Sequence, residues 1–395
     1  MQKRHIWKKL LPEISTKEIL VITGPRQVGK TTTLLWLLEQ IKDTNKIYLD
    51  LENLADRELF EIKDYNTVIS ELESRGLTTD RKMYIALDEI QLLPNLPSIV
   101  KYLYDHYNIK FFLSGSSSYY IKNRFTESMA GRKIVYEMFP LSFQEFLDFK
   151  DVEYKIDTNI FEKNSFSEPA YQKLYIHYQE FVEFGGLPQV VLTSSVGRKQ
   201  QLLEEIFSSY INIDVNSMAD FKSTKDLRNV IKLLATRIGN KLNISEIGNI
   251  AGLSRITVEN YIEFLEQTYL ISTVSVFSTS EDVKTRLQKK LYFVDTGIAN
   301  INADLSSGSK FENTIRHQLQ FLGKIQYFSD RNGEIDFILD DGSKKIALEV
   351  KETPTKTDYT TLTKRAAKLR IPTISVIGRQ PSANFTNFLW GGSIR

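Results

Sequence analysis

A glycine-rich segment near the start of the chain has the residue types that bind phosphate. Residues Gly24 to Thr31 read GPRQVGKT and fit the Walker A pattern G-x-x-x-x-G-K-[ST]. The glycines let backbone N–H groups point at phosphates, and the helix that follows adds the positive end of its dipole. Lys30 is expected to reach the β- and γ-phosphates of a nucleotide, and Thr31 to ligate Mg²⁺. The predicted nucleotide contacts are Gly24, Pro25, Arg26, Gln27, Val28, Gly29, Lys30, Thr31 and Thr32.

Two carboxylates stand at the end of a later apolar run, YIALDE. Asp88 is expected to help hold the Mg²⁺ ion, as the acid of a Walker B motif does. Glu89 is expected to polarise an attacking water as a general base. The alternative is a solvated strand end without a catalytic role. Together with the glycine-rich segment, the pair predicts binding and hydrolysis of ATP with Mg²⁺.

Polar and basic residues after the next apolar run could complete such a site. Ser116, with Ser114 and Ser117 beside it, is a candidate sensor of the γ-phosphate, although such clusters also form ordinary turns. Arg124 or Arg132 could act catalytically as an arginine finger on the nucleotide of a neighbouring subunit, which requires an oligomer. The alternative for each arginine is a surface salt bridge.

Alternating strands and helices would position these residues. Apolar runs at Glu18 to Thr23, Lys46 to Asn53, Lys82 to Gln91 and Ile109 to Ser118 each border a polar cluster, and helical stretches lie between them. This alternation predicts a parallel sheet with right-handed crossovers. Ligands of such sheets bind at the carboxyl ends of the strands, where these polar clusters are expected.

A second set of charged residues near the C-terminus could bind a metal. Glu312 lies on a predicted helix, Asp336 on a strand, and Glu349 and Lys351 on one face of the next strand. Asp336 and Glu349 could hold Mg²⁺ through hard oxygen ligands, with Glu312 assisting. Lys351 could then activate water or stabilise the charge of a phosphorane. The alternative is the charged edge of an ordinary sheet.

The last hundred residues predict a helix, three strands, a helix and a strand. These segments are FENTIRHQLQFL, KIQYFS, GEIDFIL, KKIALEVK, DYTTLTKRAAKLR and TISVIG. Cations on the second helix could meet a nucleic-acid backbone; they are Lys364, Arg365, Lys368 and Arg370.

A helix-turn-helix pattern precedes this region. Asn243 and Glu246 resemble a capping box, Gly252 ends the first helix, and Ser254 can cap the second. The stretches ISTVSVF and KKLYFVD that follow read as two strands of a wing. Such a module often lays its second helix in the major groove of DNA.

The charges of this predicted winged helix leave two interpretations open. The second helix carries Arg255 against three glutamates, which suits a phosphate-lined groove poorly. The wing is more basic, with Lys284, Arg286, Lys289 and Lys290. DNA bound through the wing and the C-terminal region is one expectation, and a structural or protein-contact module is the other.

Composition excludes several classes of protein. The 51 Lys and Arg nearly balance the 49 Asp and Glu, so global charge gives no evidence for nucleic-acid binding. The absence of Cys excludes disulfides, Cys-ligated zinc and thiol nucleophiles, and suits the cytoplasm. No apolar run is long enough to span a bilayer, and the basic N-terminus lacks a signal core. We therefore expect a cytoplasmic protein without a membrane partner.

The motifs occur in an order that resembles a known family. GPRQVGKTT, LDEIQ, LSGSSS, AGR, PLSFQEF, GGLP and KLYFVDTG are similar to prokaryotic ATPases of the AAA superfamily whose C-terminal part is called domain of unknown function 4143. The resemblance implies an ASCE-type P-loop core, a winged-helix middle and a restriction-endonuclease-like end. It also implies that Arg132, rather than Arg124, contacts nucleotide. The Gln that some PD-(D/E)XK nucleases carry shortly after the lysine is missing after Lys351.

The expected fold class is α/β: a P-loop NTPase sheet, then a helical and winged-helix middle, then a PD-(D/E)XK-like domain. The predicted domains are a P-loop ATPase core at 1–150, a helical lid or linker at 151–235, a winged helix-turn-helix at 236–296 and a restriction-endonuclease-like domain at 297–395. The predicted function is Mg²⁺-dependent ATP hydrolysis on or near DNA. The alternatives are a slow ATP-dependent switch that binds a protein partner, and an ATP-gated, metal-dependent DNA nuclease.

Overall fold

A computed structural model describes most of the chain, in two compact units. It describes residues 2–61, 64–116, 129, 131–154, 159–162, 166–215, 223–278, 288–331 and 333–394. The first unit is Met1–Phe139 with Gln267–Tyr269, and the second is Pro140–Glu266 with Leu270–Arg395. The second unit thus begins before the predicted limit at residue 150, and it includes the predicted winged helix except for Gln267–Tyr269. No helix among the described residues is both long and apolar enough to cross a membrane.

The first unit contains a five-stranded parallel sheet, as predicted. Its strand order is β2-β3-β4-β1-β5, so β4 lies between the strand before the glycine-rich loop and the strand that ends in Asp88. Every residue of β1 and β4 is buried, as expected of strands covered on both faces. The strands are β1 (Ile19–Thr23), β2 (Lys46–Asp50), β3 (Met83–Asp88), β4 (Ile109–Gly115) and β5 (Lys133–Glu137).

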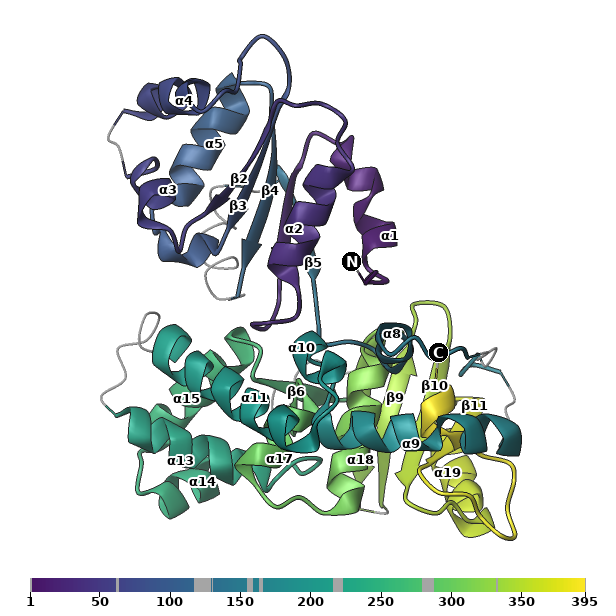
Figure 1. Ribbon diagram of the computed structural model, residues 1–395. Coiled ribbons are helices and arrows are strands. Elements are labelled where there is room, and N and C mark those ends of the chain that lie inside the picture. Colours follow the sequence, from purple (N-terminus) through teal and green to yellow (C-terminus); the bar gives the residue numbers. More distant parts are fainter. Residues whose placement is uncertain are drawn as a thin grey trace. The chain divides into compact units, whose positions relative to one another are not determined.

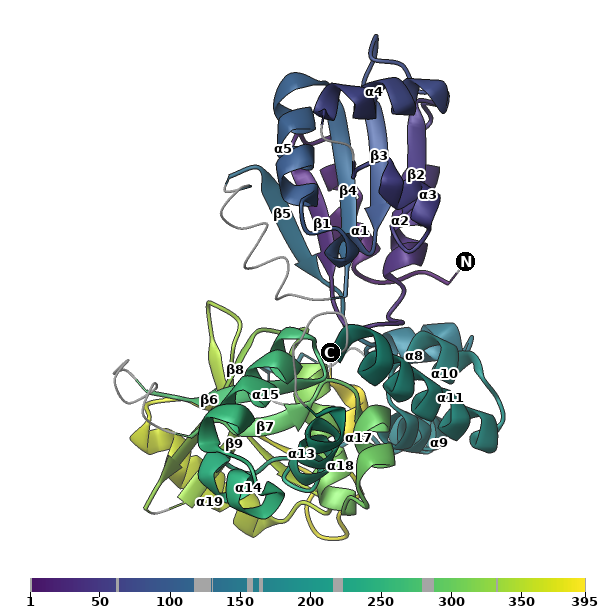
Figure 2. The same cartoon turned by 90° about the vertical axis from the view of Figure 1, so that its left-hand side faces the viewer.

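Helices cover both faces of this sheet. Figures 1 and 2 show α1 and α2 on one face and α3, α4 and α5 on the other. Apolar side chains of α4 and α5 pack against the strands, and Leu72 and Leu103 are fully buried there. Burial of each of these side chains contributes about 1.5–3 kcal/mol to the stability of the fold. This packing holds the ends of β3 and β4 beside the loop. The helices are α1 (Trp7–Leu10), η1 (Pro12–Ile14), α2 (Lys30–Glu39), α3 (Leu54–Glu58), α4 (Tyr65–Ser74), η2 (Ile90–Leu92) and α5 (Leu96–His106).

A seven-stranded mixed sheet forms the centre of the second unit, in the order β12-β11-β10-β9-β8-β6-β7. Helix α18 contacts β7 and β10, and α19 contacts β9, β10 and β11. The predicted order of helix, three strands, helix and strand is confirmed by α18 to β11. The elements are β6 (Ile271–Val276), β7 (Lys290–Phe293), α18 (Ser307–Leu319), β8 (Lys324–Asp330), β9 (Gly333–Asp340), β10 (Lys345–Lys351), α19 (Lys356–Lys368), β11 (Thr373–Gly378) and β12 (Leu389–Trp390).

The predicted wing strands belong to this sheet. β6 and β7 pair antiparallel, but β6 also pairs in parallel with β8. β6 has three buried side chains, those of Ile271, Val274 and Val276. A strand of a solvated wing would leave such side chains exposed to water. The predicted domain limit at residues 296/297 therefore cuts through one sheet. Of the cations assigned to the wing, Lys284 and Arg286 lie outside the described residues.

The remaining helices of the second unit include the predicted helix pair. Asn243 accepts a hydrogen bond from the Glu246 N–H at the start of α14, and Gly252 ends that helix in the left-handed conformation with φ 68°. α15 follows directly. The helices are α8 (Phe143–Phe149), α9 (Glu168–Phe184), α10 (Pro188–Leu192), α11 (Val196–Ser209), η3 (Tyr210–Val215), α13 (Thr224–Ala235), α14 (Ile244–Ala251), α15 (Arg255–Gln267), α17 (Thr296–Asn302) and η4 (Gly391–Ser393).

Two motifs far apart in the sequence meet inside this unit. The carboxylate of Asp295, which caps α17, accepts hydrogen bonds from the N–H groups of Gly186 (2.8 Å) and Ile298 (3.1 Å). A Cβ on Gly185 would lie 2.2 Å from that carboxylate, so only glycine fits. Burial raises the pKa of Asp295 to about 6, although the backbone N–H groups oppose the rise. GGLP and VDTG thus form one structural junction.

Candidate functional site

The glycine-rich loop curls tightly after β1. Gly24 has φ 147° and Gly29 has φ 96°, conformations that favour glycine. A Cβ on Gly24 would lie 1.9 Å from the carbonyl oxygen of Met138, so a side chain is excluded there. Gly29 is the N-cap of α2, which places Lys30 and Thr31 in the first turn of that helix. The loop therefore has the strand-before, helix-after setting that phosphate binding requires.

Two cations hold the loop from different sides. The Lys30 ammonium donates to the carbonyl oxygens of Gly24 (3.0 Å) and Pro25 (2.7 Å), so the side chain folds back over the loop. The guanidinium of Arg4 donates to the carbonyl oxygens of Val28 (2.5 Å) and Phe139 (2.8 Å). The sequence offered no signal for Arg4 beyond a basic N-terminus. Arg4 positions the loop backbone, whereas Lys30 can turn toward a phosphate.

Asp88 is the centre of the site. Its carboxylate accepts hydrogen bonds from the hydroxyls of Thr31 (2.5 Å), Tyr48 (3.0 Å) and Ser114, and from the N–H of Glu89 (3.0 Å). Asp88 is only 2% exposed, whereas Thr31 is exposed. Ser114 reaches Asp88 because β4 lies next to β3. All four of these donors are neutral groups, so none of them cancels the carboxylate charge.

Tyr48 is a site residue that the sequence did not reveal. It lies on β2, opposite Ala86 of β3 in the strand register. Burial and the neighbouring Asp88 raise the pKa of the Tyr48 hydroxyl, which therefore stays protonated and donates. The alternation within KIYLD was the available signal, because it places Tyr48 and Asp50 on one face of the strand.

The site gathers negative charge at the carboxyl ends of β2 and β3. Asp50 is the register partner of Asp88, and Glu89 follows directly. Burial raises the pKa of Glu52, the charge of Glu89 raises it further, and Arg26 opposes the rise. The Thr31 hydroxyl and the Asp88 carboxylate are hard oxygen donors in contact, which is the chemistry that Mg²⁺ prefers. These residues fit a magnesium-bound nucleotide.

Glu89 and Ser116 are linked through Gln91. The Gln91 amide donates to the Glu89 carboxylate and, at 3.0 Å, to the Ser116 hydroxyl. Glu89 has φ 53°, an uncommon left-handed conformation for this residue type. The two side chains predicted to activate water and to sense phosphate thus share one amide, which the sequence interpretation did not include. To orient a water, the Glu89 carboxylate must turn away from Gln91 or must use the oxygen that Gln91 does not contact.

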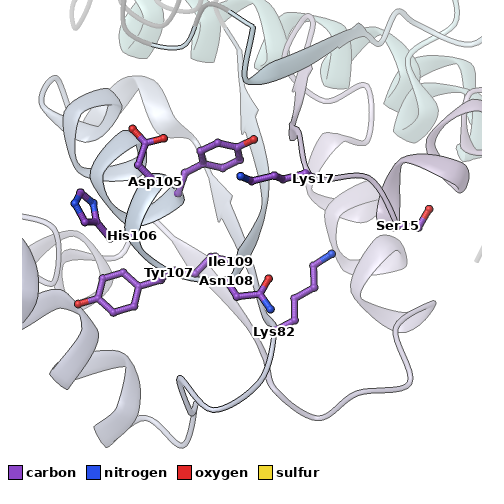
Figure 3. Close-up of a pocket in the computed structure, with 9 residues that line it drawn as sticks. Ser15, Lys17, Lys82, Asp105, His106, Tyr107, Asn108 and Ile109 are labelled. Carbon is purple, nitrogen blue, oxygen red and sulfur yellow. The ribbon is translucent and has the colours of Figure 1, made fainter.

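The prediction that Arg132 contacts nucleotide is not met within one chain. The Arg132 guanidinium donates to Asp105 at 3.0 Å, and its carbonyl oxygen accepts from the N–H of Ile19, the first residue of β1. The loop follows Thr23, the last residue of that strand, so Arg132 lies at the opposite edge of the sheet, where the amino ends of the parallel strands meet. Arg124 lies outside the described residues. A pocket of about 400 Å³ opens at this same edge (Figure 3), lined by Ser15, Lys17, Lys82, Tyr104, Asp105, His106, Tyr107, Asn108 and Ile109.

The C-terminal charged set does not form the predicted metal centre. The Lys290 ammonium lies 3.6 Å from Glu312, 3.7 Å from Asp336 and 2.5 Å from Glu334. Glu349 pairs with Lys351 at 2.8 Å. Across the described ranges, no group of three Asp, Glu or His side chains is arranged to hold a metal ion. In this arrangement Glu312 and Asp336 face Lys290, and Glu349 faces Lys351, so the predicted metal ligands are paired with lysines.

Burial dominates the electrostatics of this set. It raises the pKa of Glu312 to about 7, and the neighbouring Asp336 adds to the rise while Lys290 opposes it. Burial and Asp336 likewise raise the pKa of Glu349 to about 7, opposed by Lys351. The sequence interpretation missed Lys290 as a partner, because that residue was assigned to a solvated wing.

Comparison with known families agrees with the geometry of the first unit. Residues 16–147 match a family model described as "AAA domain". These residues are called the AAA domain below, after the model that they match. The match begins just before β1 and includes the loop, Asp88 and all five strands of the sheet. Residues 176–309 match a different model, "Domain of unknown function (DUF8612)", and not the domain 4143 that the sequence resemblance implied.

Relatives of similar length carry no assigned activity. An uncharacterized protein of Methanocaldococcus jannaschii is 28% identical over 94% of this chain and 83% of its own length. An uncharacterized protein of Haemophilus influenzae is 26% identical over 91% of this chain and 89% of its own. Among solved structures, Aeropyrum pernix ORC1 in complex with DNA gives a TM-score of 0.35 at 12% identity, over 76% of this chain and 92% of that one. The Thermotoga maritima RuvB branch migration motor gives 0.33 at 14%, over 68% and 89%. Both TM-scores are too low to inform function.

Proposed function

We propose that the AAA domain binds ATP with Mg²⁺ and hydrolyses it. One observation carries this proposal: the Thr31 hydroxyl on the phosphate-binding loop lies 2.5 Å from the Asp88 carboxylate, although 57 positions separate them in the sequence. A loop suited to phosphate and an acid suited to a divalent cation thus meet at the carboxyl edge of the sheet. That edge is where open α/β sheets bind ligands.

Each side chain has a distinct role in this proposal. The loop N–H groups and Lys30 would hold the phosphates, and Thr31 with Asp88 would hold the Mg²⁺ ion, which neutralises phosphate charge when bound. Glu89 would orient the attacking water and accept its proton. Ser116 would contact the γ-phosphate, and Gln91 would set the direction of Glu89. Arg132 would serve only on a neighbouring subunit's nucleotide, because it lies at the far edge of its own sheet.

The second unit is proposed to act on or near DNA. The side chains of Lys364, Lys368 and Arg370, on or just after α19, are exposed and could meet phosphates. Arg255 of α15 is bound to Glu259 at 2.8 Å, so this helix offers little free positive charge. Any DNA contact is therefore assigned to the α19 side. Charge reversal of Lys364 and Lys368 should weaken DNA binding and reduce its salt dependence, whereas reversal of Arg255 should change neither.

Steady-state ATP turnover and nucleotide affinity test the assignment. Lys30→Ala should lose both, because the phosphates lose their cation. Glu89→Gln should keep ATP affinity and lose turnover by roughly 10²-fold or more, since only water activation is removed. Lys42→Ala is the matched control, an exposed lysine just beyond the same helix α2 that should behave as wild type. Full activity in both Lys30→Ala and Glu89→Gln would refute the site.

A slow switch that binds a protein partner is the second candidate. The Gln91 contact with Glu89 favours it, because it holds the proposed base away from water. Ile250 and Ile256 are 55% and 69% exposed on the α14–α15 pair, as a protein-contact surface would be. Tight ATP retention with very slow turnover would support the switch. Faster turnover that rises with DNA would favour ATP hydrolysis on or near DNA.

A further inference from the structure

Lys290 is a buried cation that joins three elements of the second unit. It lies on β7 with only 3% of its side chain exposed, and its ammonium contacts Glu312 of α18 and Glu334 and Asp336 of β9. The ammonium also lies 5.6 Å from the centre of the Tyr327 ring on β8. The Tyr292 hydroxyl donates to Glu312 at 2.8 Å. This set, Lys290 with its three carboxylates, is called the Lys290 cluster below.

The ammonium occupies the point on which three carboxylates converge. Mg²⁺ needs several oxygen ligands at about 2.0–2.1 Å around one point. The oxygens of Glu312, Glu334 and Asp336 converge instead on the Lys290 nitrogen, at 2.5 to 3.7 Å. The second oxygen of Asp336 accepts from the Val350 N–H at 2.8 Å. A divalent cation would meet a fixed positive charge at this point, and the carboxylates are already engaged.

We propose that Lys290 is the resident cation of this cluster and that the second unit holds its carboxylates without a divalent metal. The Lys290 cluster is accordingly not a metal centre. It fastens the β6–β7 pair to α18 and β9, so the role of the cluster is structural. The proposal goes beyond ATP binding by the AAA domain and does not depend on it.

Thermal unfolding of the full chain without nucleotide tests the structural half. Lys290→Met keeps much of the side-chain length and removes the charge, leaving the partly buried carboxylates uncompensated. The melting temperature should fall by on the order of 10 °C. Lys345→Met is the matched control on the same sheet, because Lys345 forms an exposed pair with Asp340 at 2.8 Å. The control should shift by about 2 °C or less.

A double variant keeps the test decisive if Lys290→Met does not fold. Lys290→Met with Asp336→Asn removes one uncompensated carboxylate, while the Asn oxygen can still accept from Val350. The double variant should be more stable or more soluble than Lys290→Met alone. Wild-type stability of Lys290→Met, or a double variant no better than the single one, would overturn the proposal.

Manganese binding tests the metal half. Mn²⁺ is titrated into nucleotide-free wild type and Asp336→Asn, and the number of bound ions is measured by calorimetry. The two proteins should bind the same number. Supercoiled plasmid incubated with wild type, Mn²⁺ and ATP should stay intact. A bound ion that Asp336→Asn removes, or plasmid cleavage that this substitution abolishes, would overturn the proposal. Neither readout uses ATP turnover, so failure here is distinct from failure of the ATPase site.

Discussion

The two units each gather acidic side chains at one part of a sheet, but they balance the charge differently. In the AAA domain, Asp88 is held by three hydroxyls and a backbone N–H, all neutral. In the second unit, Glu312, Glu334 and Asp336 surround the Lys290 ammonium. The first arrangement fixes a carboxylate and leaves its charge available to an incoming cation. The second arrangement satisfies its charges internally.

The comparison shows that carboxylates alone do not define a metal site. Both sets include acids on strands, and members of both, Asp88 in the first and Glu312 and Asp336 in the second, were predicted to bind Mg²⁺. What separates them is the type of donor. A hydroxyl can donate or accept, so it adapts when a metal takes over the carboxylate oxygen, whereas an ammonium can only donate. The partners of an acid therefore carry more information than the acid itself.

The largest effect should come from replacing one aspartate carboxylate by an amide at each centre. Asp88→Asn should lower ATP turnover by roughly 10²–10³-fold, about 3–4 kcal/mol, because the divalent cation loses its carboxylate. Its melting temperature should change little, since the Thr31 and Tyr48 hydroxyls can turn and accept from the new amide. Asp336→Asn should give the reverse pattern, with unchanged turnover and a lower melting temperature. Equal patterns for the two variants would remove the distinction between the centres.

Local sequence was sufficient to bring Thr31 and Asp88 together in the first centre, but it did not reveal Tyr48 there, and it was not sufficient for the second centre. The loop from Gly24 to Thr31 is contiguous, and the ends of parallel strands meet by geometry, so the approach of Thr31 to Asp88 could be anticipated. The position of Lys290 depends on β6 pairing with β8 across a gap of about fifty residues in the sequence. That pairing turns a supposed wing cation into a buried one. The position of Arg132 within its own chain was not predictable for a similar reason, because it depends on the direction of β5.

Asp295 adds a third kind of carboxylate environment to the comparison, because it is buried and backbone N–H groups are its partners. Asp295 accepts backbone N–H groups, and burial raises its pKa to about 6 from 3.8. The folded state thus holds the proton more tightly than the unfolded state. The resulting stability is fully present below about pH 4 and is lost as the pH rises through about 6, by up to roughly 3 kcal/mol.

The measurement is the melting temperature of the second unit from pH 4 to pH 7, for wild type and Asp295→Asn. Addition of ATP with Mg²⁺ identifies the other transition, because a ligand raises only the stability of the unit that binds it. The difference between the two proteins should change with pH in the stated direction and level off above about pH 6. A difference that is independent of pH would mean that Asp295 titrates normally.

The smallest effect should come from Tyr48→Phe, which removes one neutral donor and leaves the ring in place. Asp88 would still accept hydrogen bonds from Thr31, Ser114 and the Glu89 N–H, so the free energy of unfolding should fall by about 1 kcal/mol. Turnover at saturating Mg²⁺ should fall less than about tenfold, and the Mg²⁺ concentration for half-maximal rate should rise, because Asp88 is held less firmly. Tyr102→Phe is the control, since Tyr102 donates to the exposed Asn66 in the same unit. A hundredfold loss of turnover would place Tyr48 among the reacting groups. An unchanged Mg²⁺ dependence would show that neutral donors do not tune the acid, and the contrast between the two centres would then rest on Lys290 alone.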